Sequence, residues 1–211
     1  MKTYLLSIAL LFIISADLHS QKLEGKSVRL QAITSVAMQE YFIETNCFEN
    51  GIKIKFKFKD SILMNKLRTD STYRILSKSL IETKYYRKND TIMNLYKRVD
   101  SAIKVNTVYS IDSIKINYNE NPEYEKLLAI LLNSSQAELE NKGNNKNRFV
   151  LDGTTMDFEF FQNDSIKFTA YAHSPNKTSH PLLYEYINST MNIYRGLKKN
   201  NFLTKKITSG Y

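Results

Sequence analysis

The chain has 211 residues, of which 42% are hydrophobic and 24% are charged, and its formal net charge is +9. This balance is typical of a chain that can bury a core, and it excludes a largely disordered protein. The single cysteine, Cys47, excludes an internal disulfide, and only six glycines are available for loops that cradle phosphates.

The first residues follow the order of regions of an export signal. Lys2 precedes an apolar run over residues 4–14, and small residues up to Ser20 offer a cleavage site. We therefore expect residues 1–20 to be a signal peptide and residues 21–211 to form one exported domain, periplasmic or extracellular. The alternative, a buried N-terminal strand or helix, fits this order less well. No later stretch approaches the ~20 apolar residues of a spanning helix.

The next elements predict an antiparallel hairpin. Residues 27–39 favour a strand that leads into a second strand beginning at Tyr41. From residue 52 to residue 59 apolar residues alternate with lysines, so the two kinds point to opposite faces of a strand. Asn50-Gly51 precedes this strand and is typical of a two-residue hairpin turn.

Two features of this hairpin have a structural and a functional interpretation. Cys47 is expected on the apolar face opposite Ile54 as a small hydrophobe, because no neighbouring base is indicated that would make it a nucleophile. The lysine row could bind a polyanion, but no aromatic residue interleaves with it, so we interpret it as a solvated face. The row comprises Lys53, Lys55, Lys57 and Lys59.

The middle of the chain is predicted to be mostly helical. Residues 61–105 are expected to hold a short amphipathic helix with Ile75, Leu76, Leu80 and Ile81 on one buried face, and then a helix capped by Asp90. Residues 107–118 return to a strand. Another helix starts at Asn121-Pro122, and the polar stretch 142–147 is the most plausible internal boundary.

The last third predicts a second hairpin and a helix. A short strand near Arg148 and a turn at Asp152-Gly153 lead into alternating strands on either side of a Gln162–Asp164 loop. In that register Phe158 lies opposite Phe168 on the buried face.

A helix begins at Pro181, and its apolar face is expected to cover this hairpin. That face comprises Leu183, Ile187, Met191, Tyr194 and Leu197. The whole pattern predicts an α+β fold, with an antiparallel sheet built from hairpins and packed on one face by several helices.

The C-terminal hairpin and the loop after it hold the only cluster of titratable residues that we considered as a site: Asp152, Asp157, Glu159, His173 and His180. A metal needs three or four converging ligands, and no His-Glu-x-x-His helix or paired-cysteine spacing is present. Two carboxylates on one strand face can serve glycoside hydrolysis, although such pairs more often face water. We assign no catalytic, cofactor-binding or metal-binding residue from the sequence.

The sequence therefore favours a non-enzymatic binding protein of the envelope or the cell exterior, with a protein or an envelope component as partner. Its rivals are a hydrolase acting on envelope material through the C-terminal carboxylates and histidines, and a basic protein that binds polyanions through the lysine row. Nucleic acid is an unlikely partner on this interpretation. An exported chain without disulfides and rich in Lys, Asn and Ile is typical of a bacterial envelope protein.

The export hypothesis makes a direct prediction. Protein recovered from its native host should begin between Asp17 and Lys22, because the leader is cleaved after its small residues. Mass spectrometry of the purified protein measures this. Intact Met1 on protein from a cytoplasmic fraction would contradict the localisation.

Overall fold

The computed structural model describes residues 23–34, 39–83, 90–145, 148–150 and 153–198. The chain divides into two compact units. The hairpin unit comprises residues 58–110, and the sheet unit comprises residues 1–57 and 111–211. The expectation of one domain over residues 21–211 stays a prediction, since compactness alone does not show which part folds independently. No helix within the described ranges is long and apolar enough to cross a membrane.

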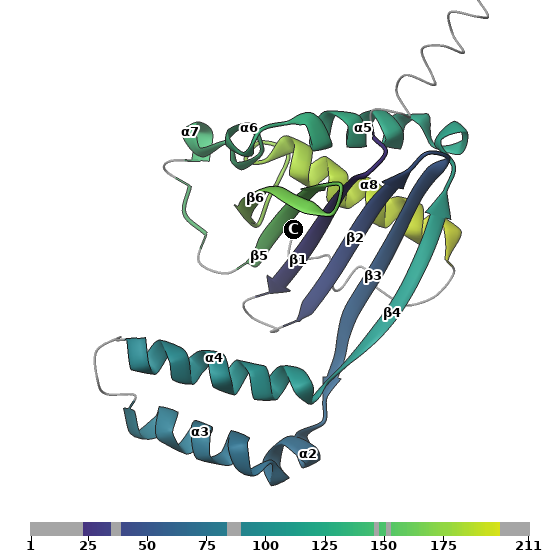
Figure 1. Cartoon of the computed structure of the whole chain (residues 1–211). Helices are drawn as coiled ribbons and strands as arrows, with labels where there is room; N and C mark the ends of the chain where they lie inside the picture. The colour runs from purple at the N-terminus through teal and green to yellow at the C-terminus, as the bar shows by residue number, and fades with distance from the viewer. Residues whose placement is uncertain (1–22, 35–38, 84–89, 146–147, 151–152, 199–211) are drawn as a thin grey trace, which may run out of the picture. The chain divides into compact units, whose positions relative to one another are not determined.

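A six-stranded antiparallel sheet confirms the predicted fold class. Its strand order is β4-β3-β2-β1-β5-β6 (Figure 1). The strands are β1 (Lys26–Thr34), β2 (Glu40–Phe48), β3 (Gly51–Ile62), β4 (Thr107–Ile116), β5 (Thr154–Gln162) and β6 (Ser165–His173). Strand β1 pairs with β2 on one side and β5 on the other, so it joins the N-terminal and C-terminal hairpins.

The turn between β2 and β3 lies one residue earlier than predicted, at Glu49-Asn50. Gly51 is the first residue of β3, with a φ of 152° that side chains rarely adopt. A Cβ at this position would clash with the carbonyl oxygen of Ile116 at the end of β4. The glycine therefore allows a close approach of β4 instead of forming the turn.

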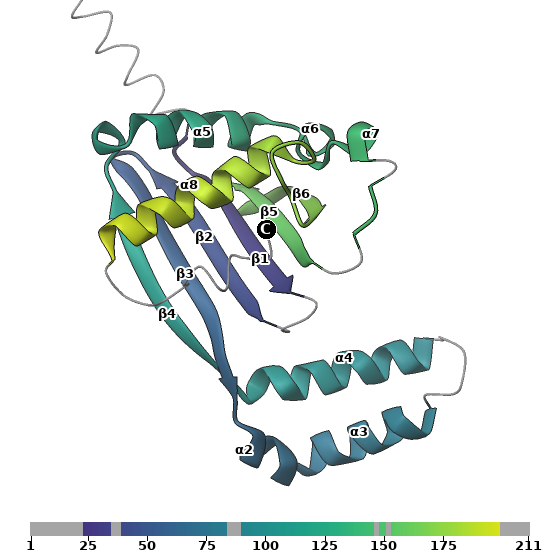
Figure 2. The ribbon, with the colours of Figure 1, turned by 180° about the vertical axis from the view of Figure 1, so that it is seen from behind.

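Helices cover one face of the sheet, as predicted (Figure 2). The covering helices are α5 (Pro122–Asn133), which follows a 3₁₀ turn, η1 (Tyr118–Glu120), and then α6 (Gln136–Glu140) and α8 (Pro181–Leu197). A short helix, α7 (Lys142–Asn145), comes after α6 and buries no side chain. The polar stretch 142–147 thus begins as a helical turn. Residues 148–150 are not in a strand, contrary to the prediction, and Phe149 is exposed. Asp152 lies outside the described residues.

Helix α8 starts at Pro181, where a missing N–H costs nothing, and crosses the sheet diagonally (Figure 2). Its predicted buried face is confirmed for Leu183, Ile187, Met191 and Tyr194. The prediction is wrong for Leu197, which is 59% exposed because the helix ends at this residue.

Hydroxyl groups tie α8 to its neighbours inside this otherwise apolar layer. The hydroxyls of Tyr186 and Thr45, on β2, are 2.8 Å apart, and both residues are fully buried. Tyr194 packs its ring 4.3 Å from that of Phe56, on β3, and donates a 2.8 Å hydrogen bond to Asp112, on β4. A buried hydroxyl without a partner is costly, so these bonds define where the helix sits.

The predicted register of the C-terminal hairpin is wrong. Gln162 pairs with Ser165, which leaves a two-residue Asn163-Asp164 turn with both residues at positive φ. A bulge follows at Phe160–Phe161, so Phe168 pairs with Phe160 and not with Phe158. The bulge restores the apolar alternation in β6 but turns Ile166 to the solvent, where it is 57% exposed.

The hairpin unit contains α2 (Met64–Thr69), α3 (Ser71–Thr83) and α4 (Asp90–Val105). Helices α3 and α4 pack on each other, with Leu76 and Ile92 buried. The predicted buried face of α3 is partly wrong, because Ile75 and Ile81 are 65% and 68% exposed. These two side chains point away from the side of Leu76, because they lie about 100° and 140° from it around the helix.

Phe158 and Glu159 are neighbours on opposite faces of β5 and give a paired test. Phe158→Ala should cost about 3–5 kcal/mol, because the side chain is fully buried and its loss leaves a cavity. Glu159→Ala should cost about 0–1 kcal/mol, because its 3.2 Å ion pair with Arg29 is largely exposed. Denaturant unfolding measures both, and equal losses would contradict the assignment of faces.

Candidate functional site

The histidine at the start of α8 is a structural residue. His180 is 5% exposed, and its Nδ1 lies 3.0 Å from the hydroxyl of Ser179. Its Nε2 lies 3.3 Å from the amide nitrogen of Asn145 on α7. Burial, and then the positive charge of Arg148, lowers the pKa of His180, so the ring is neutral near neutral pH. The histidine therefore links the β6–α8 loop to α7.

The other predicted site residues do not converge with His180. Asp157 and Glu159 point to the uncovered side of β5, and Glu159 is held by Arg29. His173 lies on the same side at the end of β6, with its Nδ1 3.4 Å from the hydroxyl of Thr155.

Prominent pockets of the described residues lie away from these candidates. Four of them are shallow, with volumes of about 530 to 730 Å³, and none of these four is lined by Asp157, Glu159, His173 or His180. Within the same part of the chain, no three His, Cys, Asp or Glu side chains are placed to hold a metal ion.

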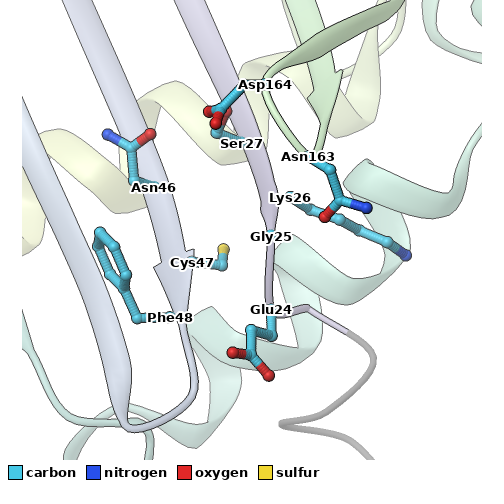
Figure 3. A pocket seen from close by; sticks show the side chains of 9 residues that line it. All are labelled: Glu24, Gly25, Lys26, Ser27, Asn46, Cys47, Phe48, Asn163 and Asp164. Atoms are coloured by element: carbon cyan, nitrogen blue, oxygen red, sulfur yellow. The ribbon is translucent and has the colours of Figure 1, made fainter.

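One of these pockets lies beside Cys47, where the end of β2, the start of β1 and the β5–β6 turn meet (Figure 3). The Cys47 thiol is 3% exposed, and burial raises its pKa to about 12. A thiol in this state is protonated and unreactive at neutral pH. The pocket therefore does not hold an activated nucleophile.

The same pocket has a structural explanation. Gly25 has a φ of 71°, donates to the carbonyl of Cys47 and accepts a 2.8 Å hydrogen bond from the backbone of Asn163. A Cβ on Gly25 would clash with the Asn163 side chain. The glycine thus joins β2 to the β5–β6 turn through its backbone, and the pocket lies at this junction.

The uncovered side of the sheet unit gathers side chains from all six strands on one surface. We call this surface the open face; no described helix of the sheet unit lies on it (Figures 1 and 2). Its members include Ile33, Phe42, Phe48, Ile111 and Tyr171, together with Arg29, Glu44, Lys53, Lys55, Lys57, Asp157, Glu159, Phe161, Ile166 and His173.

Charges of opposite sign occupy the centre of the open face. Arg29 lies directly between Glu44 on β2 and Glu159 on β5. Its guanidinium is 3.2 Å from the Glu159 carboxylate and 5.0 Å from the centre of the Phe161 ring. Two carboxylates therefore flank the arginine within the sheet, and Lys53, Lys55 and Lys57 follow the neighbouring strand β3 on the same face.

Aromatic residues share this face, which corrects the premise that no aromatic residue interleaves with the lysine row. The aromatic rings come from the neighbouring strands and not from β3 itself: Lys57 Nζ lies 5.1 Å above the ring of Phe42 on β2. Gln31, Asp157 and Tyr171 continue the same row across β1, β5 and β6. Lys59, the fourth lysine of the row, belongs to the hairpin unit.

Large apolar side chains on the open face are exposed. Phe48 and Tyr171 are 53% and 49% exposed, and the other exposed members are Ile33, Ile111 and Ile166. The alternation in the sequence predicted Ile166 on the apolar face of its strand, and it did not single out Phe48 or Tyr171 as exposed. The only sequence signal for these residues was the alternation of apolar and polar residues along each strand. Alternation assigns a residue to one face of its strand, but it does not say which residues of different strands become neighbours on the polar face.

No family model, curated protein or solved structure matches the chain.

Proposed function

We propose that the protein is an exported, non-enzymatic binding protein whose partner is another protein that docks on the open face. One observation supports this most strongly: exposed aromatic and aliphatic side chains lie among side chains of both charges on one side of the sheet. Apolar area rimmed by polar groups is typical of protein interaction sites.

The chemistry of the open face suits a protein surface better than a small molecule. Tyr171 and Phe48 are rigid side chains that bury a large area at a low entropic cost. The central Glu44–Arg29–Glu159 row offers alternating charge, which fixes the orientation of a partner with the complementary order. Small-molecule sites are usually concave, whereas the pockets found here are shallow.

A hydrolase receives less support from the geometry. Such an enzyme needs a cleft in which a carboxylate and an imidazole converge. His180 is buried in a hydrogen-bonded loop, while Asp157 and His173 lie on an open surface. A polyanion-binding protein needs a continuous basic face, and the acidic residues beside Arg29 interrupt it.

Export is part of this proposal because of the leader-like order of residues 1–20, which lie outside the described structure. The single buried cysteine is compatible with export, since a lone protected thiol has no internal partner for a disulfide in an oxidising compartment.

A photo-crosslinking amino acid placed on the open face in the native host tests the binding proposal. It should give a discrete protein adduct from position 55 or 171, and none from position 123 on α5. With the crosslinker at position 55, Tyr171→Ser should lower the adduct yield about fivefold or more, because interface tyrosines carry much of the binding energy.

The matched control is Ile130→Ser on α5, since Ile130 is about as exposed as Tyr171. This substitution should leave the adduct yield unchanged. Adducts of equal yield from positions 55 and 123, or no adduct from either open-face position, would contradict the proposal.

A further inference from the structure

Positive charge is concentrated in the hairpin unit. Residues 58–110 contain eleven Lys and Arg residues and five Asp and Glu residues, a formal net charge of +6. The chain as a whole carries +9, so about a quarter of its length holds two thirds of the surplus. A concentration of one sign attracts a surface of the other sign.

Helix α3 adds exposed apolar side chains to this charge. Ile75 and Ile81 are 65% and 68% exposed, and they lie around a shallow hollow that Arg74, Lys78 and Glu82 also line. These five residues occupy one side of α3, because their positions fall within about 120° of the helix circumference. The side that packs on α4 is the opposite one, with Leu76 buried.

Helix α4 also carries exposed apolar side chains together with basic ones. Met93 and Tyr96 are 45% and 50% exposed, and Val105, at its end, is 83% exposed. Lys97 is exposed on the same helix. Exposed aliphatic side chains beside basic ones are thus a property of both helices of the α3–α4 hairpin.

The exposed apolar side chains distinguish between two polyanions that a basic surface could bind, which are nucleic acid and anionic lipid. Single-stranded nucleic acid is bound by several aromatic rings that stack on successive bases. Tyr96 on α4 offers one exposed ring, but the exposed apolar side chains around the basic hollow of α3 are the aliphatic Ile75 and Ile81, which cannot stack. An anionic lipid surface binds both basic and aliphatic side chains, because basic groups meet the headgroup phosphates and aliphatic groups enter the boundary with the acyl chains.

We propose that the α3–α4 hairpin docks on an anionic lipid surface, with Ile75 and Ile81 inserted and Arg74 and Lys78 at the phosphates. Lys78 lies 3.9 Å from Glu82 in a highly exposed ion pair. Such a pair is weak, so the lysine can exchange its partner for a lipid phosphate at little cost. This inference concerns a different surface from the open face and does not depend on it.

Co-sedimentation of the mature protein with phosphatidylcholine vesicles, with and without phosphatidylglycerol, tests the proposal. Binding should require phosphatidylglycerol and should decrease as salt is raised. Arg74→Gln and Lys78→Gln should each weaken the partition about fivefold. Ile75→Ser with Ile81→Ser should weaken it about tenfold or more, because it removes the inserted carbons.

A matched control removes two exposed lysines from the sheet unit, Lys126→Gln with Lys177→Gln, and should change the partition less than about twofold. Circular dichroism and thermal unfolding should show all variants folded, because every substituted side chain is exposed. Equal binding to neutral and anionic vesicles, no binding to either, or an equal loss in the control would overturn the proposal. A tighter interaction with single-stranded DNA than with the anionic vesicles would also overturn it.

Discussion

The docking of α8 across one face of the sheet is the interaction on which the sheet unit depends. Its contacts reach three strands in turn: Tyr186 bonds Thr45 on β2, and Tyr194 meets Phe56 on β3 and Asp112 on β4. Apolar burial supplies most of the stabilisation, and the hydroxyl bonds restrict the helix to one position, since a shifted helix would leave them unpaired. Helix α5 then packs against α8 and completes the layer.

This one-sided cover determines the character of the other face. When helices cover only one face of an antiparallel sheet, water contacts the other face. Here that face carries the Arg29–Glu159 ion pair, and it also leaves Phe48 and Tyr171 exposed. The sequence shows which residues alternate, but the open face depends on strand order. Strand β1 lies between β2 and β5, which are about 110 residues apart in the chain, and no local pattern predicts that neighbourhood.

The fold itself was largely predictable, because alternation and turn chemistry are local properties. The strands, the Pro181 start of α8 and the covered face follow from them. The register of the C-terminal hairpin was not predictable, because a bulge beside Phe161 adds one residue to a strand that otherwise alternates regularly. Ile75 was assigned to the wrong side of α3, because apolar residues occur on both sides of that helix and periodicity alone could not choose between them.

Thiol labelling tests most directly the claim that one face is closed by α8 and the other is free. In folded Thr169→Cys protein, the new thiol lies on the exposed side of β6, whereas the native Cys47 lies on the covered side of β2. Peptide mass spectrometry should find position 169 modified at the rate of a free thiol, and Cys47 modified only after denaturation. Fast modification of Cys47, or protection of position 169 in the isolated protein, would contradict the account.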